Sequence, residues 1–126
     1  MRGLDTNVLV RYLTQDDPEQ SRRAARYIEA DTCFIGSIVL CELVWVLESA
    51  YDYPRQVIAE VLEKILMTGG FQVEDRDLAW SALRDYRRTK ADFADCLIAR
   101  RNRAAGCEET GSFDKNVKGV ADFRLL

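Results

Sequence analysis

The sequence of 126 residues contains no histidine. This absence excludes a Ser-His-Asp triad, a Cys-His pair and a ribonuclease mechanism that depends on histidine. It also argues against a catalytic zinc site, because such sites are usually built on histidine ligands. Any hydrolytic chemistry must therefore come from carboxylates, hydroxyls, lysine or a metal ion.

Long apolar runs and paired cysteines are absent as well. The longest apolar run, from Ile38 to Leu47, is interrupted by Glu42 and is too short to cross a bilayer. No apolar leader develops before Asp5, so we expect a cytoplasmic protein without a membrane partner. The cysteines show no C-x-x-C spacing, which favours free, mostly buried thiols over disulfides at Cys33, Cys41, Cys96 and Cys107.

The composition that remains is that of a globular protein, with 48% hydrophobic and 31% charged residues and a net charge of -3. A chain of this length can bury one core, so we expect a single domain over residues 1–126. The net charge argues against a general nucleic-acid coat protein. Charge is unevenly distributed along the chain, however. Residues 84–103 include seven Lys or Arg residues and only three Asp or Glu residues. This basic belt could meet phosphates or simply solvate helix faces.

Short apolar strands alternate with helical periodicity along the chain. We expect strands at 2–5, 32–36, 71–73, 110–113 and 121–123. Helices are expected at 7–13, 18–28, 37–50, 54–68, 75–88 and 92–105, with Ser37 as the cap of the third. This alternation predicts an α/β fold with a short, mostly parallel central sheet flanked by helices. Ligands of such sheets bind beyond the carboxyl ends of the strands.

Four acids stand out against their surroundings. Asp5 ends an apolar strand, so it either caps the following helix or holds a ligand. Glu42 has only apolar residues three and four positions away on its helix (Ile38, Val39, Trp45 and Val46). This pattern predicts a buried carboxylate that needs a partner or a cation, although a partly exposed Glu beside a large Trp remains open.

The other two acids have structural alternatives. Asp92 and Asp95 lie one turn apart, and Asp92 could be a helix cap. Asp95 leads into an apolar run, which favours an inward orientation, whereas Asp114 could be a turn or cap residue. If Asp5, Glu42, Asp95 and Asp114 converge, their repulsion calls for a hard cation such as Mg²⁺ or Mn²⁺, one ion or two. The alternative is that these acids never meet.

Four segments of the chain resemble those of PIN-domain proteins in their order and spacing. They are "LDTNVLV", the S-x-x-x-x-E spacing from Ser37 to Glu42, "DFADCLIA" and "GSFDKN". The chain is similar to the VapC-like toxins of type II toxin–antitoxin systems. The resemblance implies a three-layer PIN-like fold, a homodimer and an antitoxin partner. It also implies the activity of a Mg²⁺- or Mn²⁺-dependent endoribonuclease. Such an enzyme cuts single-stranded regions of RNA, including tRNA, and inhibits translation unless an antitoxin neutralises it.

The resemblance also assigns residues. The acidic quartet falls on Asp5, Glu42, Asp95 and Asp114, with helper groups at Thr6, Asn7 and Ser112. Ser112 stands where the family commonly has Thr and keeps the hydroxyl. Asn116 stands where a further acid often follows in the family. The absence of that negative charge would weaken a second metal site, and Asp92 could compensate for it.

The mechanism that these residues indicate is phosphodiester hydrolysis by metal-activated water, with Glu42 positioning or deprotonating that water. Basic side chains would follow the RNA backbone, with Arg84, Arg87, Arg88, Lys90 and Lys115 as the first candidates. Two alternatives remain. Another Mg²⁺-dependent phosphoryl hydrolase is disfavoured because Asn7 occupies the position of its second acid. A catalytically silent PIN-fold binding module is disfavoured because all four acids are present.

Overall fold

A computed structural model describes residues 1–126 and confirms the α/β class. The helices are α1 (Thr6–Thr14), α2 (Pro18–Glu29), α3 (Ser37–Ser49), α4 (Arg55–Met67), α5 (Arg76–Arg88) and α6 (Phe93–Ala104). The strands are β1 (Arg2–Gly3), β2 (Cys33–Ile35), β3 (Phe71–Val73), β4 (Thr110–Ser112) and β5 (Phe123–Leu125). A single 3-10 turn, Lys115–Val117, follows β4. The last strand begins at Phe123, two residues later than the expected start at residue 121.

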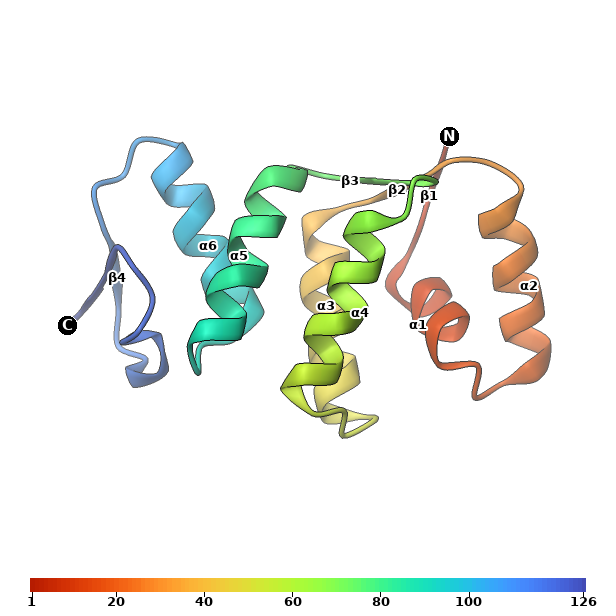
Figure 1. The fold of residues 1–126 in the computed structure, drawn as a ribbon, viewed down its shortest axis with the longest axis horizontal. Coiled ribbons are helices and arrows are strands. Elements are labelled where there is room, and N and C mark those ends of the chain that lie inside the picture. The colour runs from red at the N-terminus through yellow and green to blue at the C-terminus, as the bar shows by residue number, and fades with distance from the viewer.

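All strand pairs are parallel, as expected, but the strands divide between two sheets instead of forming one. β1, β2 and β3 form the first sheet in that order, and β4 pairs with β5 in the second. Figure 1 shows α2 near one end of an elongated molecule and β4 near the other, with α3 to α6 between them. The carboxyl ends of β1 and β4 therefore belong to separate sheets.

One hydrophobic core runs through the helices and the first sheet. Most of its largest fully buried side chains come from α3, α4 and α5, and α1, β2 and α6 add one each. Tyr86 of α5 and Phe93 of α6 meet edge to face at 6.1 Å. Val117 and Val120 belong to the same core and fasten the C-terminal segment to it. None of the helices is both long and apolar enough to cross a membrane.

The N-terminus of α3 corrects the expected cap. Gly36, not Ser37, occupies the N-cap position. Glycine has no side chain that could accept a hydrogen bond from the first backbone N–H groups of the helix. Instead the carboxylate of Glu74, which follows β3, accepts the N–H of Ser37 at 2.9 Å. This bond lowers the pKa of Glu74. The buried hydroxyl of Ser37 accepts from Arg101 of α6 at 3.0 Å, so the end of α3 is joined to two distant elements.

The α5–α6 pair is held by a partly buried ion pair. Asp85, which is 9% exposed, accepts two hydrogen bonds from the guanidinium of Arg100 at 2.7 and 2.9 Å. At the turn between the two helices, one Arg55 nitrogen donates to the carbonyls of Tyr86, Thr89 and Ala91. These contacts fix the start of α6, which carries Asp92 and Asp95.

Candidate active site

Asp5 and Glu42 belong to one polar group at the carboxyl end of β1. Asp5 is exposed and occupies the N-cap position of α1, where its carboxylate accepts the N–H of Thr6 at 2.8 Å. The hydroxyl of Thr6, which is buried, donates to Oε1 of Glu42 at 3.0 Å. Thr6 therefore links the two predicted acids, and the capping alternative for Asp5 is confirmed without removing its second oxygen from use.

The expected burial of Glu42 is wrong. Glu42 is exposed on α3, and its apolar neighbours Ile38 and Trp45 are themselves 76% and 68% exposed. The helical spacing correctly predicted that Ile38, Glu42 and Trp45 share one face of α3. It did not predict that this face is exposed to solvent. A carboxylate on this face is hydrated and needs no ion to compensate burial. Its only side-chain partner is Thr6, which leaves Oε2 free.

A second acidic group forms at the start of α6. Asp92 is exposed and sits at the N-cap position, but its side chain makes no capping bond. Asp95, one turn further, is half-buried, as its apolar surroundings predict. Burial and the carboxylates of Asp92 and Asp114 raise the pKa of Asp95 above its ordinary value. Asp95 is therefore repelled by both of the other acids, and none of the three has a Lys or Arg ion-pair partner.

Asp114 and Ser112 arrange the turn after β4. The Ser112 hydroxyl oxygen accepts the N–H of Asp114 at 3.0 Å, and Asp114 accepts the N–H of Asn116 at 2.8 Å. The predicted cap role of Asp114 is therefore present, and Asn116 contributes only its backbone to this bond. The hydroxyl proton of Ser112 remains available because its oxygen is the acceptor here.

The structure relates the predicted acids to one another in two ways. Asp5 and Glu42 share Thr6 as a hydrogen-bond partner, whereas the carboxylates of Asp92 and Asp114 raise the pKa of Asp95. No three carboxylate or thiol groups lie close enough to hold one metal ion. Mg²⁺ is commonly bound by one or two carboxylates and keeps several waters, so a pair of carboxylates in either group fits such an ion. The donors are all oxygen, which is the chemistry of a hard cation.

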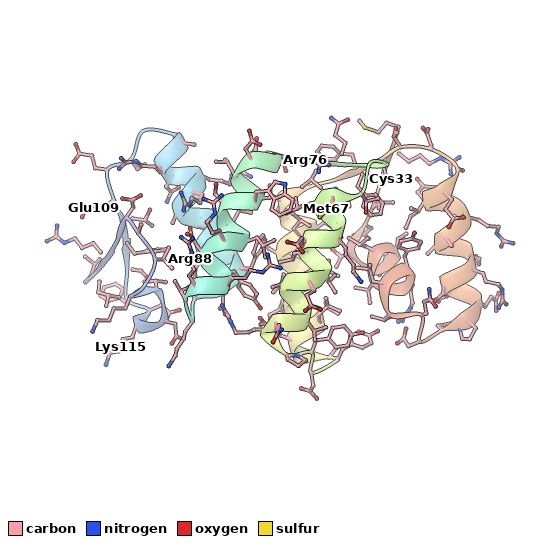
Figure 2. All side chains as sticks on the ribbon, viewed as in Figure 1. Cys33, Met67, Arg76, Arg88, Glu109 and Lys115 are labelled. Carbon is pink, nitrogen blue, oxygen red and sulfur yellow. The ribbon has the colours of Figure 1, made fainter.

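The basic belt separates into paired and unpaired members. Arg100 is bound to Asp85, Arg101 lies near Asp75 at 3.6 Å, and Arg103 lies near Asp122 at 3.7 Å. Arg87 pairs with Glu63 at the surface. Exposed side chains without an ion-pair partner remain at Arg84, Arg88, Lys90 and Lys115. Figure 2 shows Arg88 and Lys115 in the half of the molecule that carries β4.

A cavity of about 810 Å³, which the sequence did not predict, opens beside Asp5 between α1 and α2. Asn7 and Arg11 line one wall, and Gln20, Arg23 and Tyr27 line the other. The second set has helical spacing, three, four and seven residues apart, so the sequence indicates that these residues share one face of α2. The sequence does not indicate that this face lies against α1 next to an acid.

Comparison with known proteins identifies the family of the chain. The family model "PIN domain" matches residues 4–122, which include Asp5, Glu42, Asp95 and Asp114. The chain is 31% identical over 123 residues to "VapC ribonuclease" of Aquifex aeolicus (strain VF5). This similarity covers 94% of the chain and 90% of that relative. The chain belongs to the PIN-domain family and resembles its VapC ribonucleases.

Proposed function

We propose that the chain is a metal-dependent endoribonuclease of the VapC toxin type, acting on single-stranded regions of cytoplasmic RNA such as tRNA. The observation that supports this most is the group of Asp92, Asp95 and Asp114. Their carboxylates are close enough to raise the pKa of Asp95, and no cationic side chain neutralises them. A structural acid cluster of this kind costs stability, and a functional one is relieved by a bound cation.

The proposed cation is Mg²⁺ or Mn²⁺, one ion or two, bound by carboxylates of Asp5 and Glu42 and of Asp92, Asp95 and Asp114. Such an ion, when bound, lowers the pKa of a water ligand and neutralises charge on the phosphate. The chain's own contribution is to hold the acids. Thr6 orients Glu42 through its hydroxyl. In the turn after β4, the N–H of Asp114 donates to the Ser112 hydroxyl oxygen and the Asp114 carboxylate accepts the N–H of Asn116.

Proton transfer falls to a carboxylate because the chain has no histidine. Glu42 is the candidate base, since one of its oxygens accepts from Thr6 and the other is free and exposed to water. The Ser112 hydroxyl and the Asn7 amide can donate to phosphate oxygens. The unpaired cations Arg84, Arg88, Lys90 and Lys115 would bind the RNA backbone.

The proposed partners follow from the same assignment. A toxin of this type is neutralised by a cognate antitoxin and acts as a homodimer. An exposed apolar stripe of α3, made by Ile38 and Trp45 on either side of Glu42, is available for protein contact beside the acids. Contact of a protein with this stripe would cover Glu42 as well.

The test is cleavage of a labelled single-stranded RNA by purified single variants. We expect Asp95→Asn and Asp114→Asn to lose cleavage, because each removes an oxygen ligand while leaving the shape of the side chain. Glu60→Gln, at an exposed acid of α4, is the matched control and should keep full activity. Loss of activity in all three variants, or in none, would contradict the assignment of Asp95 and Asp114.

A further inference from the structure

The cavity between α1 and α2 carries polar groups that nothing in the chain satisfies. Arg23 has no ion-pair or hydrogen-bond partner, and the amide of Asn7 makes no side-chain hydrogen bond. Gln20 accepts the Nε–H of Arg11 with its amide oxygen at 2.7 Å. That bond leaves both amide hydrogens of Gln20 free. One cavity therefore presents three unused donor groups, all exposed to solvent.

The walls of this cavity are held in place. Arg11 also donates to Asp16 at 3.0 Å and to the Tyr51 hydroxyl at 3.2 Å, so its guanidinium is a bracket between α1 and α2. The Ser21 hydroxyl donates to the carbonyl of Arg11 at 2.8 Å. Arg11 is therefore a positioning residue that fixes Gln20, while Arg23 retains an uncompensated positive charge.

Tyr27 adds a flat apolar surface at the same site. Its side chain is 41% exposed and lines the cavity one turn beyond Arg23. The guanidinium of Arg2 lies 4.6 Å from the ring centroid and donates to the Tyr27 carbonyl at 3.3 Å. Arg2 covers one face of the ring and restrains it. The remaining face can stack with another planar group.

Asp5 is the only carboxylate that lines this cavity, and it is also one of the proposed metal ligands. Resting on the proposed ribonuclease function, we propose that this groove binds the single-stranded RNA segment adjoining the scissile bond. Arg23, Asn7 and Gln20 contact phosphate and sugar oxygens, and a base stacks on Tyr27. Arginine and amide donors beside an aromatic ring are the groups that bind single strands without sequence preference.

The experiment measures RNA affinity and leaves cleavage out. The protein carries Asp95→Asn and is kept in EDTA, and a labelled single-stranded oligonucleotide is titrated by fluorescence anisotropy over a range of salt concentrations. Arg23→Gln should reduce the slope of log affinity against log salt by about 0.7, the value for one phosphate contact on a single strand. Arg22→Gln is the matched control. It makes the same charge change at the adjacent, exposed position, which is turned about 100° around α2 and does not line the cavity.

Tyr27→Ala should weaken binding by roughly tenfold through loss of stacking, and Tyr27→Phe should leave the affinity unchanged. Equal effects of Arg22→Gln and Arg23→Gln, or an unaffected Tyr27→Ala, would overturn the RNA groove. So would the case in which Arg23→Gln alters sedimentation and leaves RNA affinity unchanged, since the groove would then bind protein. Failure of the wild type to cleave RNA with metal would reject the proposed function separately, because these affinities are read without cleavage.

Discussion

Removal of the Asp85 carboxylate should destabilise the protein more than removal of any surface acid. Asp85→Ala deletes two short hydrogen bonds to Arg100 and leaves that guanidinium facing the space vacated by the carboxylate. Loss of one partner of a fully buried pair costs about 3–5 kcal/mol, and loss of an exposed pair costs about 0–1 kcal/mol. The side chains here are 12% and 35% exposed, so Arg100 can partly return to water.

The expected cost therefore lies between these limits, at about 2–3 kcal/mol. Unfolding entropy of about 2.1 cal/mol/K per residue amounts to roughly 0.26 kcal/mol/K for a chain of this length. The melting temperature should consequently fall by about 8–11 °C. Thermal melts and urea denaturation followed by circular dichroism, both in EDTA, measure the two quantities independently.

The control is Glu63→Ala, which breaks the Arg87–Glu63 pair at 3.1 Å, whose side chains are 40% and 41% exposed. This variant should lose less than about 1 kcal/mol, a shift of at most a few degrees. If Asp85→Ala lowers stability no more than Glu63→Ala, the α5–α6 ion pair does not fix the start of α6, and the reasoning is refuted.

Three further predictions concern the acids and the belt. Because the pKa of Asp95 is raised, its charged form destabilises the folded chain; Asp95→Asn should be more stable than wild type at neutral pH in EDTA, and the difference should vanish as pH falls below the ordinary aspartate range, as melts across pH would show. At about one hundred times its Kd a bound ion stabilises a protein by about 2.7 kcal/mol, and thermal shift with Mn²⁺ should show a much smaller rise for Glu42→Gln than for wild type; equal rises would remove Glu42 from the site. The double variant Arg88→Gln and Lys90→Gln should reduce the salt slope of RNA binding by about 1.4, and an unchanged slope would place the RNA elsewhere.

Local elements were predictable from the sequence because their signals are local. Asp17 with Pro18 marks the start of α2, and its carboxylate accepts the N–H of Gln20 as the pattern predicts. The cap of α3 was not predictable in this way. Glu74, which supplies it, lies 37 residues along the chain, and only the parallel pairing of β2 with β3 places it there.

The site acids were predictable as residue types but not in their environment. Apolar neighbours at helical spacing predicted a buried Glu42, yet Ile38 and Trp45 lie on a face that no other part of the chain covers. Burial of a helix face depends on which elements pack against it, and spacing gives only the face. Likewise, the order of strands along the chain did not indicate that β4 would pair with β5 alone.

We propose that carboxylates and a divalent ion cut RNA in this protein. The most direct measurement is cleavage of a labelled single-stranded RNA by the wild type in Mg²⁺ or Mn²⁺, then in EDTA, and then after the metal is restored. An identically purified Asp95→Asn sample serves as the control for contaminating nuclease. We predict cleavage that EDTA abolishes and metal restores, with none in Asp95→Asn. Cleavage that persists in EDTA, or that Asp95→Asn retains, would contradict metal-dependent cleavage by these carboxylates.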